Sequence, residues 1–508
     1  MILQLAFPSN QSEEAARGFD NDERLKKQDF KMSNIFPRLR SPGRLRKLIH
    51  FGYKLSALLL TLIIGTTLMT DSLHAAQESS VVTPSPVKVI DYKTELGLAG
   101  WHVETPDIPV LTISICFRNA GDKNDPEGLK GLTEFMCGML DEGAGIYNSG
   151  NFKALLLEKN IRLSISQNSD SVFITLRSTK DNIKDLFDIL TMILMAPRFD
   201  DDAMARVREQ ILTSLNQSLH SEGQVASDTF NQQAFKNHPY GRSTIVEIEG
   251  IKKIKREDIQ KYLKERLARD QIKITSAGNL TVNELKNYLD NALKELPEKA
   301  VPSTVKDVEP IYTGDITVIP MDIPQSLILF YQPGIKRHDK DFYAAYVLNK
   351  ILGDGGFKSR LWDEVRENRG LAYGIDSDLR WIQHSEYMVG STATANANAG
   401  QVVEIIREQW RKVKESGVTQ KEKDFVIERL TGAFPLGFSS TPQIVGLLNN
   451  YQQDDLEADF INKRNEMMRR VTLEDLNRLA RNLIQPDKLS FIIVGKPEGL
   501  PHPTGAKK

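Results

Sequence analysis

The sequence predicts an α+β fold made of two related domains, each with an antiparallel-rich sheet and helices on one face. Three observations lead to this prediction. Strand-like runs alternate with longer helical patterns, proline-containing stretches divide the chain into two blocks, and a pattern in the first block recurs in the second. A chain of 508 residues is also too long for one domain.

The expected elements follow from hydrophobic periodicity. In the first block we expect strands at 110–117, 162–166 and 172–177, and helices at 128–142, 180–195 and 201–219. In the second block we expect strands at 326–331, 373–379 and 386–392, and helices at 343–352, 358–366, 401–416 and 419–430.

The recurring pattern is a helix start followed by an apolar strand that ends in glycine. Four residues of the first block recur 217 positions later in the second: Glu257, Asp258, Asp270 and Gly278 match Glu474, Asp475, Asp487 and Gly495. Four identities at one offset indicate a duplicated domain. Linker-like stretches at 78–86 and 296–314 then predict a first domain at 77–305 and a second at 306–508.

The N-terminal region, 1–76, is predicted to be an extension followed by a secretory signal peptide. Residues 32–54 hold six basic side chains and no acid, residues 55–70 are uncharged and apolar, and Ala75 offers a cleavage position. The apolar run is short for a membrane span, which needs about 20 residues. We therefore expect a periplasmic protein, and Leu73 near the cleavage position leaves an inner-membrane anchor as the alternative.

Composition excludes several classes of protein. The net charge of −1 gives no reason to expect a nucleic-acid partner, and two cysteines with eight histidines exclude zinc-finger and disulfide-rich classes. In an oxidising compartment Cys116 and Cys137 could pair or stay unpaired in the core, and the sequence leaves both open. It also leaves open whether Met1 or Met32 is the true start.

Four stretches carry the chemistry: GLTEFMCGMLDEGA at 131–144, FDDDAMARVREQIL at 199–212, HPYGR at 238–242, and a glycine-rich turn leading to RENRGLAY at 353–373. In this order and spacing they resemble the pitrilysin/insulinase family of zinc peptidases, which includes the mitochondrial processing peptidase. The resemblance covers residues of about 88–496 and implies two homologous domains arranged as a clamshell.

The family's zinc motif is H-x-x-E-H, with a third ligand about 76 residues after the second histidine. The ligand positions here are Glu134, Gly138 and Ser214, and the general-base position is Cys137. These residues cannot supply three ligands for tetrahedral zinc. We therefore expect a degenerate metal site and no zinc in this chain, with Glu134 a solvated helix residue and Cys137 filling space.

The last stretch, unlike the first, matches the family at the residues that take part in the chemistry. The resemblance implies that Arg366 and Tyr373, at the family's spacing of seven, reach the scissile peptide and act as donors to developing negative charge. The alternative is that Arg366 pairs with a helix carboxylate such as Asp363 and Tyr373 packs in the core.

The resemblance also implies a substrate-binding edge strand. Its residues are Ser164, Ile165, Ser166, Gln167 and Asn168. An edge strand offers unpaired backbone groups to an extended or unfolded peptide without needing zinc.

The sequence thus predicts a non-catalytic subunit of a periplasmic heterodimeric zinc metallopeptidase, inactive alone. Its partner would be a homologous subunit that carries H-x-x-E-H and the zinc. The alternative is a stand-alone peptide-binding or scaffold protein with the peptidase fold. A hydrolase of another type lacks support, because no G-x-S-x-G motif is present.

Overall fold

The computed structural model describes residues 87–354 and 358–500. The predicted signal peptide and its cleavage position lie outside these residues. Among the described helices, none combines the length and the apolar character needed to cross a bilayer.

The N-terminal half is built on a six-stranded sheet with the order β1-β2-β8-β3-β7-β6. The strands are β1 (Ile90–Lys93), β2 (Ala99–Glu104), β3 (Val110–Arg118), β6 (Arg162–Gln167), β7 (Ser171–Thr179) and β8 (Ile272–Gly278). Only β2 and β8 run parallel, and the other neighbours are antiparallel. A separate ribbon joins β4 (Gly143–Ala144) and β5 (Tyr147–Asn148).

Helices of the same half pack on one face of this sheet. They are α2 (Leu132–Met139), α3 (Ser149–Glu158), α4 (Ile183–Met195), α8 (Arg256–Arg266) and α9 (Val282–Leu293), and α5 (Asp201–Ser218) packs on α2. Side chains alternate along a strand, so Ile113 and Ile115 of β3 join the core beneath the helices while Thr112 and Ser114 face the opposite side.

The C-terminal half repeats this plan. Its sheet has the order β11-β12-β10-β13-β9. The strands are β9 (Ile316–Pro320), β10 (Gln325–Pro333), β11 (Ala372–Ile382), β12 (Ser385–Ala395) and β13 (Ser490–Gly495). The helices are α10 (Phe342–Leu352), α11 (Arg360–Trp362), α12 (Ala399–Ser416), α13 (Gln420–Gly432), α15 (Phe460–Arg469) and α16 (Leu473–Leu483).

The two sheets share one topology. In the first sheet, the strands β2-β8-β3-β7-β6 begin with one parallel pair and continue with antiparallel pairs. The strands β9-β13-β10-β12-β11 of the second sheet show the same pattern. The repeated glycines end equivalent strands with φ of +158° at Gly278 and +144° at Gly495. A two-domain α+β fold is therefore confirmed, and the predicted boundary near 305 falls in a segment without helix or strand between α9 and β9.

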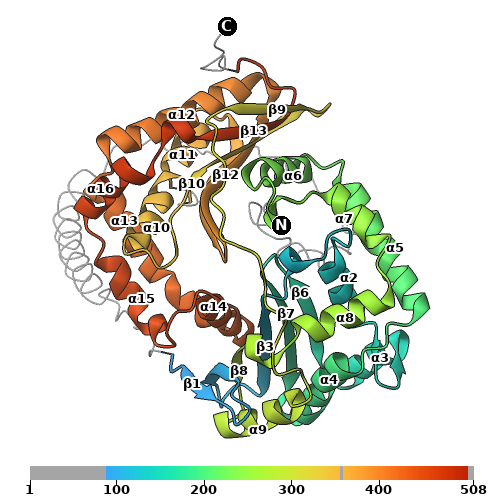
Figure 1. Ribbon diagram of the computed structural model, residues 1–508. Helices are drawn as coiled ribbons and strands as arrows, with labels where there is room; N and C mark the ends of the chain where they lie inside the picture. The colour runs from blue at the N-terminus through green and yellow to red at the C-terminus, as the bar shows by residue number, and fades with distance from the viewer. Residues whose placement is uncertain (1–86, 355–357, 501–508) are drawn as a thin grey trace, which may run out of the picture. The chain divides into compact units, whose positions relative to one another are not determined.

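Each sheet is covered on its second face by a helix from the other half (Figure 1). Helix α6 (Glu222–Ala234) packs on the C-terminal sheet, where the Phe230 ring lies 4.9 Å from Tyr331 and 5.3 Å from Tyr387 between centroids. Helix α14 (Thr441–Gln453) packs on the N-terminal sheet against Trp101. The sequence predicted helices on one face of each sheet, whereas helices cover both faces.

Candidate functional site

The site is built from α2, which begins later than the sequence pattern suggested. Gly131 has φ of +89°, and the helix starts at Leu132. The Asp125 carboxylate accepts hydrogen bonds from the Gly131 and Thr133 amides, at 2.8 and 3.0 Å, and from the Thr133 hydroxyl. These bonds satisfy amides at the helix start. Burial raises the pKa of Asp125 to about 7 although the hydrogen bonds oppose the rise.

Glu134, at the first metal-ligand position, is half-buried rather than solvated. It makes no hydrogen bond or ion pair to any described residue, although it lines a pocket between α2 and β6. Burial raises the pKa of Glu134 to about 7, with further contributions from the nearby Glu247 and Asp125 carboxylates. Glu134 is therefore more enclosed than a freely exposed helix residue, because it lies beside the edge strand.

The two cysteines are both buried free thiols. Cys137 belongs to the core under α2, in line with the expected space-filling role. Burial raises the pKa of the Cys137 thiol far above neutrality, and that of Cys116 to about 12. Burial therefore favours the protonated form of both thiols, whereas a metal ligand is the thiolate.

Helix α5 closes over the second ligand position. A Cβ atom added at Gly138 would lie 3.1 Å from the Val207 Cγ1 atom and 3.9 Å from the Ile211 Cδ1 atom. Ile211 lines the pocket with Gly138, whereas Ser214 is exposed and is not among the lining residues. The pocket has a volume of about 340 Å³ and is lined by Glu134, Cys137, Gly138, Asp141, Ile165, Ser166, Gln167 and Ile211.

These donors do not fit zinc. A structural or catalytic zinc needs at least three protein ligands, usually Cys, His or carboxylate, and the pocket offers two carboxylates, a buried thiol, two neutral polar side chains and apolar groups. Within residues 87–354 and 358–500, no group of three or more His, Cys, Asp or Glu residues is placed to hold a metal ion.

The predicted substrate strand lies at the edge of the N-terminal sheet. Ser164 to Gln167 belong to β6, which pairs only with β7 among the described strands, and Asn168 follows in the turn. Ser164 and Ser166 are exposed, whereas Ile165 and Gln167 are half-buried on the side of α2. The strand therefore has a backbone edge open to an added strand beside the degenerate metal position.

Arg366 and Tyr373 lie together, as their spacing implied. The Arg366 guanidinium carbon is 4.8 Å from the Tyr373 ring centroid and 4.2 Å from that of Trp362. Tyr373 is 88% exposed, and the nearest carboxylate to Arg366 is Glu367 at 3.9 Å. Arg366 thus lies near a carboxylate of its own helical turn, Glu367 rather than Asp363, whereas Tyr373 does not pack in the core as the alternative required.

The backbone around this pair is irregular at two points. The expected helix at 358–366 divides into α11 and a π-helical turn, η6 (Asp363–Glu367), which holds Arg366. The pairing of β11 with β12 shifts register between Ala372 and Ile375, so Tyr373 sits at a β-bulge. Both kinds of irregularity re-aim side chains and are frequent at functional sites.

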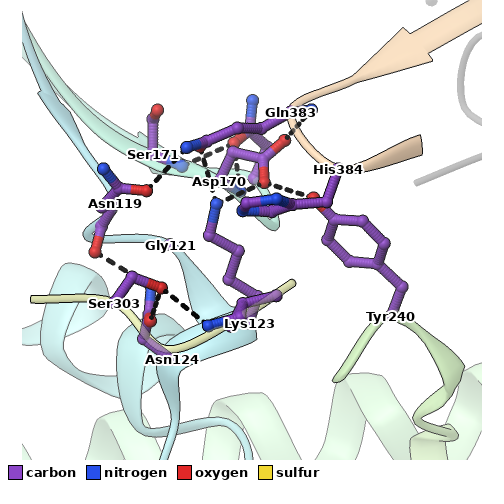
Figure 2. Close-up of polar contacts among 12 residues, drawn as sticks. Asn119, Gly121, Lys123, Asn124, Asp170, Ser171, Tyr240, Ser303, Gln383 and His384 are labelled. Atoms are coloured by element: carbon purple, nitrogen blue, oxygen red, sulfur yellow. Dashed lines mark hydrogen bonds and ion pairs between the residues drawn. The ribbon is translucent and has the colours of Figure 1, made fainter. Parts of the chain in front are cut away.

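A polar network that no motif predicted joins the turns of the two edge hairpins (Figure 2). The Asp170 carboxylate, in the β6–β7 turn, accepts hydrogen bonds from the Tyr240 hydroxyl at 2.6 Å and from the backbone N–H of Gln383 at 3.1 Å. It also binds the Lys123 ammonium, which donates to the Gln383 side chain at 2.7 Å. Tyr240 comes from the HPYGR stretch, so that motif has a structural role here.

Arg242 of the same stretch ties the network to α7 (Thr244–Ile251). Its Nε donates to Glu247 at 2.6 Å and it forms an ion pair with Asp122. These groups and Glu134 line a second pocket, of about 440 Å³, which also includes Asn168 and Asp170. Arg366 and Tyr373 line neither pocket that contains Glu134.

Known protein families match both halves of the chain. The family described as insulinase (peptidase family M16) matches residues 103–247, and the one described as peptidase M16 inactive domain matches residues 253–430.

Curated relatives include a protein of Helicobacter pylori named non-peptidase homolog YmxG. It is 26% identical over 392 residues, which are 76% of this chain and 89% of the relative. The mitochondrial-processing peptidase subunit beta of Saccharomyces cerevisiae is 19% identical over 418 residues, covering 78% of this chain and 89% of the relative.

Solved structures share the fold. The peptidase M16 inactive domain from Pseudomonas fluorescens has a TM-score of 0.75 and 23% identity, covering 82% of this chain and 99% of that one. A protease from Helicobacter pylori has a TM-score of 0.73 and 17% identity, covering 80% and 99%. Together with the unsuitable metal position, the name of the Helicobacter pylori relative, non-peptidase homolog, supports a non-catalytic protein. The chain belongs to the insulinase, or peptidase M16, family.

Proposed function

We propose that this chain is the non-catalytic subunit of a two-chain M16 metallopeptidase and supplies Arg366 and Tyr373 to the active site of a homologous partner. The observation that carries the proposal is the contrast between the two halves. The metal position has lost its ligands, whereas the Arg366–Tyr373 pair is solvent-accessible and stacked. The zinc and the H-x-x-E-H motif would belong to the partner.

The geometry of the pair suits this role. Arg366 lies against both Trp362 and Tyr373, and this stacking restricts the guanidinium while leaving its edge able to donate. The exposed Tyr373 is free to present its hydroxyl to an oxygen that gains negative charge during peptide hydrolysis. Because the two donors are already restrained, they need little reorganisation when the reaction occurs.

Reconstitution with the H-x-x-E-H subunit tests the proposal. We expect peptidase activity from the mixture and from neither chain alone. Tyr373→Phe should lower kcat by about 10²–10³, the usual cost of one oxyanion donor, without weakening complex formation. Arg369→Ala is the matched control, because Arg369 is exposed in the same segment and pairs with Glu364. Full activity of an Arg366→Ala/Tyr373→Phe variant would refute the role.

The periplasm is the proposed location. Its support is the order of a basic run, the apolar run at 55–70 and Ala75 in the sequence. N-terminal sequencing of the protein from a periplasmic extract should give a start near Ala76. A chain that retains residues 55–70 would instead be membrane-anchored.

A stand-alone peptide-binding protein is the second candidate, and the open edge of β6 beside a pocket favours it. Such a protein would bind extended peptides with no partner present. Peptide binding together with failure to activate any H-x-x-E-H subunit encoded with it would favour this candidate.

A further inference from the structure

The pocket between α2 and β6 lies at the edge of the N-terminal sheet, because residues of the edge strand β6 form part of its lining. Ile165 and Gln167 of β6 point to the α2 side and line the pocket with Glu134. Successive side chains of a strand point to opposite faces of its sheet. A peptide paired to β6 would therefore direct every second side chain to the α2 side, toward Glu134.

Glu134 differs from other shielded glutamates of this half. Glu142 forms ion pairs with Lys153 and Arg206 and accepts a hydrogen bond from Ser149, and Glu247 is paired with Arg242. Glu134 has no partner among the described residues. Its carboxylate is therefore free to accept a hydrogen bond from a cationic group that enters the pocket.

The remaining lining suits a long side chain with a charged end. Ile165 and Ile211 provide apolar contacts for an aliphatic stem, and Glu134 and Asp141 lie on the helix side of the same pocket. Lysine and arginine bury their stems against apolar surface while their charged ends meet polar groups. A guanidinium or ammonium beside a carboxylate gives a charge-assisted hydrogen bond.

We infer that the pocket between α2 and β6 takes the lysine or arginine side chain of an extended peptide paired to β6, with the Glu134 carboxylate as its acceptor. The inference deepens the proposed function, because it rests on peptide binding at β6 and adds a basic specificity to it. The position that a zinc ligand would occupy thus becomes a specificity residue for substrate.

The protonation of Glu134 makes this preference depend on pH. With a pKa of about 7 the free carboxyl is partly protonated near neutrality. A basic side chain favours the ionised form. Preference for a basic residue should therefore be full near pH 8 and weaken as the pH falls toward 6.

Peptide binding to the isolated chain tests the inference without a partner. The probes are fluorescein-labelled, threonine-rich peptides of one host sequence with arginine, norleucine or glutamate at a single position, measured by fluorescence anisotropy. At pH 8 we expect the arginine peptide to bind roughly tenfold more tightly than the norleucine peptide, which corresponds to about 1.4 kcal/mol. Glu134→Gln should reduce this ratio to about twofold or less.

Glu209→Gln is the matched control. Glu209 is an exposed residue of α5 that lines neither pocket, and the substitution removes the same charge. It should keep the full preference. Equal binding of all three peptides, no binding of any, or a preference that survives Glu134→Gln would overturn the inference. Activation of the partner is measured separately, so a chain that activates its partner without basic preference refutes this inference alone.

Discussion

Lys123 and Asp170 form an ion pair in which the ammonium nitrogen lies 2.8 Å from the carboxylate and the lysine side chain is 0% exposed. Gln383 contacts both groups from the turn between β11 and β12. The pair therefore connects the turn that follows one edge strand, β6, with the turn that follows the other, β11 (Figure 2).

Asp170→Ala should lower the free energy of unfolding by about 3–5 kcal/mol, because it leaves the Lys123 ammonium buried without a counter-charge. Urea denaturation followed by tryptophan fluorescence measures the change. Asp188→Ala is the control, since Asp188 is 55% exposed in its pair with Lys184 and should cost less than about 1 kcal/mol. Equal, small effects of both substitutions on the free energy of unfolding would show that the buried pair stabilises the fold no more than the exposed pair does.

Leu448→Ala should destabilise the protein by about 2–5 kcal/mol, the cost of a cavity at a fully buried leucine. Leu448 belongs to α14 but packs on the N-terminal sheet, so both halves should still unfold in one transition at a lower urea concentration. Leu436→Ala, at a leucine that is 71% exposed, should change stability by less than about 0.5 kcal/mol. We attribute the single transition to α6 and α14, which each pack on the sheet of the other half. A two-step unfolding curve, with only one half affected, would contradict this explanation.

Glu134→Gln should stabilise the peptide-free protein at high pH and not at low pH. The folded-state pKa of about 7 lies above the ordinary value of 4.5, so ionising Glu134 costs the fold stability. The cost is absent below about pH 4, grows between 4 and 7, and is constant above that range. At pH 8 the variant should gain roughly 1–3 kcal/mol over the natural protein. Thermal denaturation from pH 4 to 8 measures this difference, and a gain that does not change with pH would contradict the cause given.

The sequence predicted most strands and helices because their apolar periodicity is strong, as in β3 and α4. It also predicted the duplicated topology, since matching residues end equivalent strands at Gly278 and Gly495. It predicted neither α6 nor α14 as a helix. It also could not predict that each packs on the sheet of the other half, because an amphipathic pattern does not specify which sheet covers the apolar face. The π-turn at Arg366 and the bulge at Tyr373 depend on tertiary pairing and have no pattern in the sequence.

Part of the site was also beyond sequence reasoning. A fixed count along the chain placed the third ligand position at Ser214, but the α5 side chains beside Gly138 are Val207 and Ile211, and of these Ile211 lines the pocket. The helical phase, set by packing of α5 on α2, decides which residue faces the pocket. Lys123, Asp170 and Gln383 come together only in the folded chain, and each is unremarkable in its own stretch.

Zinc binding by designed variants tests whether Ile211 or Ser214 occupies the third ligand position. The natural protein should hold no stoichiometric zinc after dialysis, as measured by plasma mass spectrometry. Adding Glu134→His, Cys137→Glu and Gly138→His supplies two ligands, which are too few for stable binding. A fourth substitution, Ile211→Glu, should bring the content toward one zinc per chain, because Ile211 lines the pocket. Ser214→Glu in its place should not, because Ser214 is exposed and is not among the residues lining the pocket. Equal zinc content in the two fourfold variants would show that α5 can turn to present either residue, and zinc in the natural protein would refute the degenerate site itself.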